Sequence, residues 1–404
     1  MDDKPLFLDF VSDDGQWGGQ FQILSLRSQH SQSSNRPLPD IHIFCRMGQN
    51  QELISTFTAK LQEHMIPLLP RLGMLRLVTD VPILFSLISF LNSNQFPVLV
   101  KLCIEVAQSD NVDVSQYRRM LNFLTISAQS YPALSSLNLK GMFDTGIIPD
   151  PMVQTTFPWN QITEMVWEEQ AYCDPNICRF LSLCQNLVSC RIIYPGSNFD
   201  HRSWPFPNGK VRLPRLTHLQ IDIIQETNVF PFLSTLSTPT LEDLTIGLAP
   251  RCRTGPCPVA ALCVLRDSSG GLVKLKSFRG TNFNWTTDLL LGFLNSCPSL
   301  QWVDILHAIC DIPQIIMDLS ADPQALRSLI RFCIDVQVQT EPKWRQIHEL
   351  LLTYCCPGFH GEAPLSFIIR KAEGDGDEEK IVSTTRYKFR SRPGELEFVD
   401  RNVS

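Results

Sequence analysis

Aliphatic and polar residues alternate along much of the chain in short segments that follow one template. The template is Leu-x-x-Leu-x-Leu, often with a Pro two residues before the first Leu. Its most regular copy is LPRLTHLQIDI, in which Leu216, Leu219 and Ile221 recur at spacings of three and two. Alternation with a period of two is typical of a strand that buries one face. Each copy therefore predicts a short strand with its aliphatic side chains inward and its polar ones outward.

The template recurs eleven times, and the first positions of successive copies lie 25 to 36 residues apart. These first positions are Leu72, Leu99, Leu134, Ile162, Leu187, Leu216, Leu241, Leu272, Leu300, Leu329 and Leu365. Most spacings fall in or near the period of leucine-rich repeats, roughly 20–29 residues. The registers at Leu272 and Leu329 are the least regular, and Ser277 occupies a Leu position in the former. An error of one residue there would exchange buried and exposed side chains.

Segments with the apolar spacing of helices lie between the strands. They are VPILFSLISFL from Val81, ICRFLSLC from Ile177, VFPFLSTLS from Val229, TTDLLLGFLNSC from Thr286 and IPQIIMDL from Ile312. A unit of one strand, one loop and one helix cannot bury its apolar face alone, so neighbouring units must stack. We therefore expect an α/β fold, a leucine-rich-repeat solenoid (horseshoe) with an inner parallel sheet and outer helices.

The two ends of the chain differ from this array, which we expect over residues 66–370. Residues 1–65 contain strand-like PLFLDFV, FQILSL and IHIFC and are predicted to form an irregular N-terminal cap or partial repeats. Residues 371–404 are highly charged, with KAEGDGDEEK before IVSTTRYKF and GELEFV, and are expected to form a C-terminal cap or tail. A strand or hairpin is favoured there, because a terminal repeat must present a polar side to water.

Charge and composition narrow the classes of partner. The 404 residues carry a net charge of −6 and no long basic run, whereas proteins that bind phosphate backbones present a basic face. The longest apolar stretch is shorter than the ~20 residues that span a bilayer, and the N-terminus lacks the pattern of a secretory signal. We therefore expect a monomer in the cytoplasm or nucleus, without nucleic-acid or membrane partners and with reduced cysteines.

Catalytic and metal-binding motifs are weak in this sequence. The segment HELLL at His348 lacks the second His of a zincin helix, and no nucleophile elbow or dinucleotide fingerprint occurs. Cysteines cluster over 173–190 and 252–263, but the closest knuckles have four intervening residues, the loose limit for structural zinc. Cys184 and Cys190 fall at apolar positions of the repeat and are predicted to be buried. We expect no catalytic, cofactor-binding or metal-binding residues and no enzyme; a catalytic site in one of the two end regions is the alternative.

The outward positions of the predicted strands supply the candidate binding residues. One row reads Arg76, Cys103, Asn138, Val166, Arg191, Gln220, Thr245, Lys276, Asp304 and Cys333. Its mixed chemistry suits a protein partner better than a polyanion. We predict partner-binding roles on the concave face for Arg76, Asn138, Glu164, Arg191, His218, Gln220, Asp243, Lys276, Trp302 and Asp304. For Trp302 a role at the edge of the core is the alternative, whereas Trp167 is predicted to be core.

Three copies of the template resemble the repeats of fungal F-box proteins, namely CPSLQWVDI, LPRLTHLQI and TPTLEDLTI. The resemblance includes the preceding helices, which end in FLNSC or FLSTLS. The resemblance covers residues ~60 to ~370, the span of the repeats. In that family the repeats hold a protein substrate, and an F-box docks on the adaptor of a cullin-based ubiquitin ligase. The resemblance implies a non-enzymatic recognition module that is the substrate-binding part of a ligase receptor.

An F-box usually begins with Leu-Pro-x-Glu before an apolar helix, and no segment of this chain matches that pattern. Binding to the ligase adaptor is therefore expected only if an F-box lies upstream. The alternatives are a stand-alone leucine-rich-repeat scaffold and a truncated remnant without a ligase role.

Overall fold

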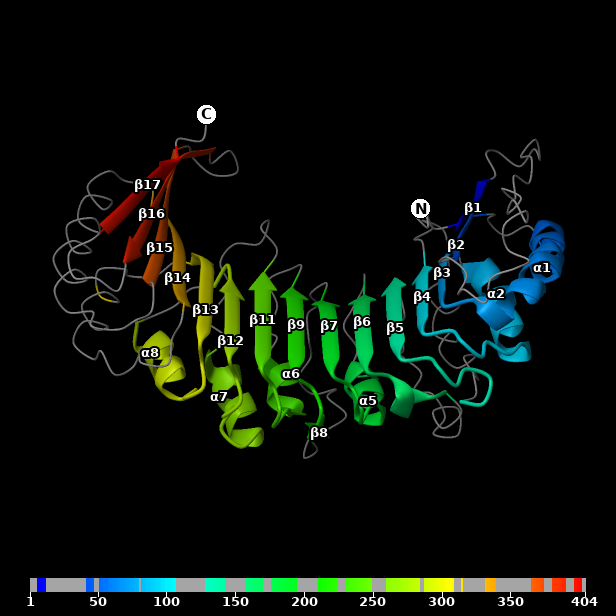
Figure 1. The fold of residues 1–404 in the computed structure, drawn as a ribbon, viewed down its shortest axis with the longest axis horizontal. Coiled ribbons are helices and arrows are strands. Elements are labelled where there is room, and N and C mark those ends of the chain that lie inside the picture. Colours follow the sequence, from blue (N-terminus) through cyan, green and yellow to red (C-terminus); the bar gives the residue numbers. More distant parts are fainter. Residues whose placement is uncertain are drawn as a thin grey trace. The chain divides into compact units, whose positions relative to one another are not determined.

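The computed structural model describes residues 6–11, 41–46, 51–79, 81–106, 128–141, 157–169, 176–194, 210–223, 230–248, 259–283, 287–308, 314, 331–338, 365–373, 380–389 and 396–401 (Figure 1). The chain divides into two compact units, Met1–Ser197 and Asn198–Ser404. Each unit is of mixed α/β type and is built on a large sheet of mainly parallel strands.

The described strands of the first unit follow one another in sequence order, and every neighbouring pair is parallel. They are β1 (Leu6–Val11), β2 (Ile41–Arg46), β3 (Met74–Thr79), β4 (Lys101–Val106), β5 (Ser136–Gly141), β6 (Glu164–Glu169) and β7 (Ser189–Tyr194). The helical elements are α1 (Gln51–Met65), η2 (Ile66–Arg71), α2 (Val81–Ser93), η4 (Trp159–Gln161) and α5 (Asn176–Leu183). The strand-like segments PLFLDFV and IHIFC thus pair in parallel as β1 and β2, and FQILSL lies outside the described residues.

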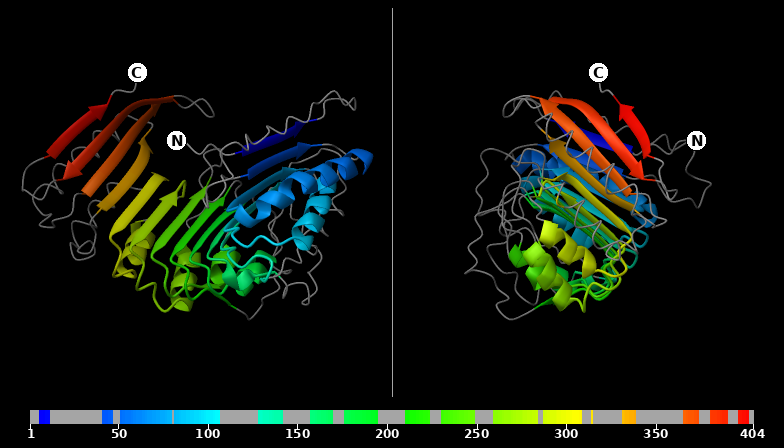
Figure 2. Two further views of the ribbon diagram at one scale, coloured as in Figure 1. Left: turned by 45° about the vertical axis from the view of Figure 1, so that its right-hand side comes forward. Right: turned by 90° about the vertical axis from the view of Figure 1, so that its left-hand side faces the viewer.

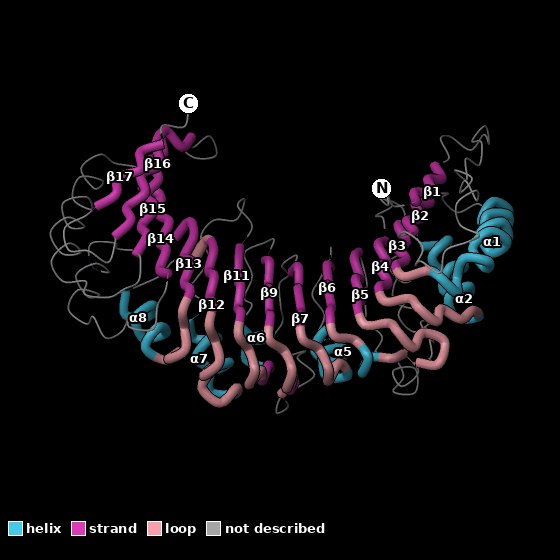
Figure 3. Tube along the Cα trace, viewed as in Figure 1, coloured by secondary structure: helices cyan, strands magenta, loops and turns pink. Residues whose placement is uncertain are grey.

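The second unit has the same organisation over most of its length (Figures 2 and 3). Its parallel strands are β9 (His218–Ile223), β11 (Asp243–Leu248), β12 (Ser277–Thr281), β13 (Trp302–Ala308), β14 (Arg331–Val338) and β15 (Leu365–Glu373). Two antiparallel strands follow, β16 (Lys380–Phe389) and β17 (Leu396–Arg401), and the short β8 (Val211–Arg212) and β10 (Leu236–Ser237) pair with each other. The helices are α6 (Phe230–Thr235), α7 (Val259–Ser268) and α8 (Thr287–Asn295), and consecutive helices are in contact.

Each sheet buries the aliphatic side of its strands under helices. In the most regular copy, Leu216, Leu219 and Ile221 are all buried. The ring of Phe278 on β12 packs on Phe293 of α8 with centroids 4.8 Å apart. In the first unit Trp167, the largest fully buried side chain, lies 5.4 Å from the ring of Phe180 on α5, which confirms its predicted place in the core. The side chains that alternate with these residues must therefore project from the opposite, open side of each sheet.

The predicted helices are confirmed wherever the structure describes them. The segments from Val81, Ile177, Val229 and Thr286 form α2, α5, α6 and α8. The segment from Ile312 falls outside the described residues except for residue 314. The two C-terminal segments predicted as a strand or hairpin form β16 and β17, which pair in antiparallel register. No helix in the described ranges is long and apolar enough to cross a membrane.

The predicted register at Leu272 is wrong by three residues. Phe278 pairs with Leu244 and Gly280 with Ile246, so Leu275 takes the first position of this copy. The preceding helix ends in a glycine turn, in which the N–H of Gly271 donates to the carbonyl of Arg266 at 2.8 Å. Positive φ angles run from Gly270 through Leu272. This six-residue capping turn includes Leu272, which the repeat pattern had placed at the first position of the segment that leads into the strand.

Of the two C-terminal copies, one has the predicted strand register and the other does not. Phe332 pairs with Val303 and Ile334 with Ile305, which is the register predicted for the copy at Leu329, a residue outside the described part. Leu365 pairs with Phe332 instead of occupying a first position, so its predicted register is wrong by three residues. The strand β15 has nine residues and continues into an antiparallel pair, so it does not follow the short-strand template.

Candidate functional site

The candidate site is the open side of each sheet, opposite the helices. We define the first face by the outward residues of β3–β7: Met74, Arg76, Val78, Lys101, Cys103, Glu105, Ser136, Asn138, Lys140, Glu164, Val166, Glu168, Ser189, Arg191 and Ile193. We define the second face by those of β9–β13: His218, Gln220, Asp222, Asp243, Thr245, Gly247, Ser277, Arg279, Thr281, Trp302, Asp304 and Leu306.

On the first face the predicted row of outward residues is in register. Arg76, Cys103, Asn138, Val166 and Arg191 are successive cross-strand neighbours. Their exposure differs, because Cys103 is only 5% exposed whereas Arg191 belongs to the exposed residues. The row thus offers a partner its two arginines and the amide of Asn138.

The predicted Glu164 is also exposed on the first face. It lies in the row that runs from Ser136 to Ser189, beside the row of Asn138. This places it on the same open surface as Arg191, on the neighbouring strand.

An ion-pair ladder crosses the first face from β3 to β6. Arg76 donates to Glu105 at 2.7 Å, Lys140 lies 3.6 Å from Glu105, and Lys140 lies 3.3 Å from Glu168. All four side chains are partly exposed, and ion pairs of this kind each contribute only about 0–1 kcal/mol. The sequence prediction omitted Glu105 and Lys140, although the spacing that placed Arg76 outward also places Glu105 outward.

The second face corrects one predicted residue. Its central row consists of Gln220, Thr245, Arg279 and Asp304, so Arg279 stands where Lys276 was predicted. The error follows from the three-residue register shift at Leu272. Lys276 lies immediately before β12, and its ammonium group donates to the Glu242 carboxylate at 2.7 Å. This hydrogen bond is the main reason that the pKa of Glu242 lies below its ordinary value.

Asp304 is held within the second face. Its carboxylate accepts from the Arg279 guanidinium at 3.1 Å, and its side chain is 12% exposed compared with 53% for Arg279. A carboxylate with so little access to water depends on its cationic partner. Asp304 therefore orients Arg279, and Arg279 is the more accessible residue of the pair.

Asp222 and Gln220 form a second polar pair on β9. The Gln220 amide donates to both carboxylate oxygens of Asp222, at 3.0 and 2.8 Å. Because both residues are half-buried, this arrangement fixes their orientation on the face. The predicted Gln220 thus acts together with a carboxylate two residues further along the strand.

Thr217, His218 and Asp243 form a hydrogen-bonded series at the start of β9 and β11. The Thr217 hydroxyl lies 2.7 Å from His218 Nδ1, and His218 Nε2 lies 2.8 Å from the Asp243 carboxylate. The order hydroxyl, imidazole, carboxylate is the one that activates nucleophiles in acyl transfer. Such chemistry also requires free donors that stabilise an oxyanion. Here the backbone N–H groups of Glu242 and Asp243 both donate to the Thr217 carbonyl at 2.9 Å. The series is better suited to hydrogen bonding with a partner.

Trp302 is the most distinctive side chain of the second face. It is 40% exposed, and among the exposed large hydrophobic side chains of the described residues it is the one that lies within a strand. It occupies the same row as His218, Asp243 and Ser277. Tryptophans in such positions often contribute most of the energy of a protein interface.

The cysteines near the repeat cores are buried thiols. Burial raises the pKa of Cys184 to about 12, and burial together with the neighbouring Cys184 raises that of Cys190 further. Metal ligation requires the thiolate, which these sites disfavour. Among the described residues no group of three or more His, Cys, Asp or Glu side chains could hold a metal ion. Cys173, Cys252, Cys257 and His348 lie outside the described residues.

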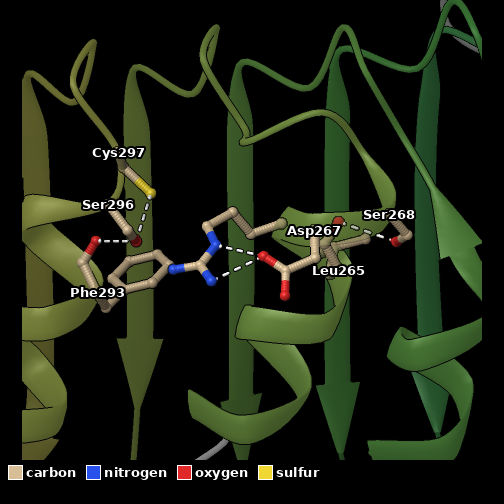
Figure 4. Close-up of polar contacts among 7 residues, drawn as sticks. Leu265, Asp267, Ser268, Phe293, Ser296 and Cys297 are labelled. Atoms are coloured by element: carbon tan, nitrogen blue, oxygen red, sulfur yellow. Dashed lines mark hydrogen bonds and ion pairs between the residues drawn. The ribbon is translucent and has the colours of Figure 1, made fainter.

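Polar side chains on the helix side of the second unit make internal contacts. Figure 4 shows the Ser268 hydroxyl donating to the Leu265 carbonyl and the Ser296 hydroxyl donating to the Phe293 carbonyl, at 3.0 and 2.7 Å. Ser268 also donates to the carbonyl of Leu236 at 2.6 Å, which ties the end of α7 to the preceding copy. These contacts stabilise helix ends, so the open sheet faces remain the stronger candidates for partner binding.

No family model matches this chain, and a search of curated proteins found no match.

Proposed function

We propose that this protein is a non-enzymatic recognition module that binds a protein partner on the open side of its sheet. The observation that carries the proposal is the second face, where Trp302 and a set of fixed polar groups lie in register on four neighbouring parallel strands. An apolar anchor surrounded by oriented hydrogen-bonding groups is the usual composition of a protein interface.

The architecture that we infer is a leucine-rich-repeat solenoid. Its support is the agreement between the repeated template and the strands of each unit. Nine of the predicted first positions, from Leu72 to Leu329 and without Leu272, lead into parallel strands with the expected register. In solenoids of this kind each repeat contributes one strand to an extended binding surface.

A protein partner fits both faces better than a nucleic acid. The first face has four basic and three acidic side chains, and the second has one basic and three acidic side chains with His218 counted as neutral. Nucleic-acid affinity comes mainly from an excess of Lys and Arg that neutralises phosphates. Neither face has the large excess of cations over anions that such binding needs.

Site-specific photo-cross-linking tests this proposal. A photoreactive residue at Thr245 on the second face should capture a partner from cell extract and then capture the same partner from a purified mixture of the two proteins. The matched control is Val264, which is exposed on α7 on the helix side. Capture from Val264 alone, or no partner that binds as a purified protein, would contradict a binding role for the sheet.

The narrower form of the proposal is that recognition serves a cullin-based ubiquitin ligase. Its support is the resemblance of CPSLQWVDI, LPRLTHLQI and TPTLEDLTI to the repeats of fungal F-box proteins. Affinity purification of the protein from its native cells should then recover the ligase adaptor together with the partner. Recovery of the partner without the adaptor would instead identify a stand-alone scaffold.

A further inference from the structure

The second face is asymmetric in charge. Its acidic residues are Asp222, Asp243 and Asp304, and its basic residue is Arg279, which gives a net charge of −2 with His218 neutral. Arg279 and Asp304 pair with each other and contribute no net field. The remaining negative charge lies on β9 and β11, and the Glu242–Lys276 pair beside it is neutral.

Asp243 is the carboxylate best placed to meet a partner. Its side chain is 42% exposed, and its ion-pair partner is the imidazole of His218, which carries no fixed charge. Asp222 on β9 adds to the negative electrostatic potential of the second face, and the amide of Gln220 orients its carboxylate. A cation that approached this part of the face would therefore reach a carboxylate that is 42% exposed.

Asp243 and Trp302 are aligned for one linear segment. They occupy the same row, on β11 and β13, with Ser277 of β12 between them. Two strand spacings separate them by roughly 10 Å, since neighbouring strands lie about 4.8 Å apart. A peptide in the polyproline II conformation has three residues per turn and rises about 3.1 Å per residue, so side chains three residues apart lie on one face about 9 Å apart. Two side chains of such a peptide, three residues apart, would reach both positions.

Ser277 makes that path accessible. Its side chain is small, and the indole of the neighbouring Trp302 is 40% exposed. A guanidinium or an aliphatic stem packs well on an indole, and the electron-rich face of the ring attracts a cation. The row thus joins a carboxylate to an aromatic surface, and Lys and Arg side chains can use both.

We propose that the second face binds a basic segment of a partner protein, with a Lys or Arg against Asp243 and a further Arg or Lys, three residues away, over Trp302. This inference rests on the function proposed above and specifies its partner. The occupant is a segment of another protein, and a second copy of this chain, whose first face carries a net charge of +1, is the competing occupant.

The test uses the full chain and a phage-displayed library of random 12-residue peptides. Peptides retained by the wild-type protein at physiological salt are sequenced, synthesised and measured by fluorescence anisotropy against D243N and W302A. The matched control is D288N, which removes an exposed carboxylate on α8, outside both faces. Thermal melting of every variant checks that each is folded.

The proposal predicts that the recovered peptides contain Lys or Arg pairs spaced by three residues. Their affinity should fall about tenfold in D243N, as expected when one charge pair worth 1.4 kcal/mol is lost, and at least as much in W302A. D288N should bind like the wild type.

Recovered peptides without net positive charge, or the absence of any peptide whose binding depends on Asp243, would overturn the proposal. So would self-association of the chain that D243N abolishes, because the occupant would then be a second copy. These failures are separable from failure of the proposed function: a partner cross-linked from Thr245 but insensitive to D243N leaves recognition intact and removes only the basic segment.

Discussion

The first and second faces share one template but arrange their polar residues differently. On the first face acids and bases alternate between strands, so that Arg76, Glu105, Lys140 and Glu168 form a continuous ladder of ion pairs. On the second face acids exceed bases, and the exposed indole of Trp302 lies in the same row as Asp243. Outward side chains of neighbouring repeats can thus either form ion pairs with one another or remain available for contacts with a partner.

The difference follows from the chemistry of cross-strand neighbours. Opposite charges on adjacent strands stabilise each other by about 0.2–1 kcal/mol, which a competing partner must replace. A row with a surplus of one sign and a large exposed ring leaves charge that a partner can neutralise and apolar surface that it can bury. We therefore expect the proposed partner to bind on the second face, and four predictions test this difference between the faces.

The largest expected effect is that of W302A on binding. Removal of the indole should lower the affinity for the cross-linked partner about 30-fold, because a central aromatic anchor contributes about 2 kcal/mol to binding. Stability should change little, since the side chain is partly exposed. Isothermal titration calorimetry measures the affinity, and V188A, which truncates an exposed valine beside β7, is the matched control. A threefold or smaller loss in W302A, or an equal loss in V188A, would remove the distinction between the faces.

The second prediction concerns the buried carboxylate of the second face. D304N should lower the free energy of unfolding by on the order of 1 kcal/mol, because it leaves the Arg279 guanidinium without its charged partner. Urea denaturation followed by circular dichroism measures the change. Partner affinity should fall as well, since Arg279 loses its orientation. An unchanged urea midpoint would show that the 3.1 Å contact contributes nothing to stability.

The third prediction addresses the ladder of the first face. E105Q removes the carboxylate that contacts both Arg76 and Lys140, yet it should cost less than about 1 kcal/mol because all three groups reach water. The loss should shrink further at 1 M salt, where charges are screened beyond about 3 Å. The same urea assay applies, with S189A as the uncharged control. A loss in the free energy of unfolding that is larger for E105Q than for D304N would contradict the difference that we propose between the two faces.

The smallest expected effect is that of Lys276, which lies immediately before β12, on the pKa of Glu242. Lys276 lowers the pKa of Glu242, so the pair stabilises the fold above the ordinary carboxyl pKa and loses that contribution as the pH falls through the lowered value. K276M should return the pKa of Glu242 towards its ordinary range. A carboxyl-detected NMR titration of wild type and variant measures the shift, and equal titration curves would contradict the assigned cause.

The sequence was sufficient to predict the strands and the direction of most of their side chains. Leu216, Leu219 and Ile221 are buried as the alternation requires, and the row from Arg76 to Arg191 is in register. These features depend on local periodicity, which a single segment reveals. The error at Leu272 arose because Gly270 and Gly271 end the helix in a capping turn, and the length of such a turn is not encoded in the alternation.

Interactions between strands were harder to predict. The Glu105–Lys140–Glu168 series depends on which residues of different copies become neighbours, so it follows only once the register is known. Asp304 was correctly placed on the open side, but its burial depends on Arg279, 25 residues away in sequence. The prediction of Lys276 failed for the same reason, because it required the register that the glycine turn had shifted.

Hydroxyl-radical footprinting of Trp302 in the free protein and in the complex tests the central claim most directly. In the free protein Trp302 should be oxidised readily and the buried Trp167 hardly at all, in keeping with exposures of 40% and 1%. The account predicts strong protection of Trp302 when the partner is bound and an unchanged signal for Trp167. Equal oxidation of Trp302 in the free and bound states would contradict binding on the second face.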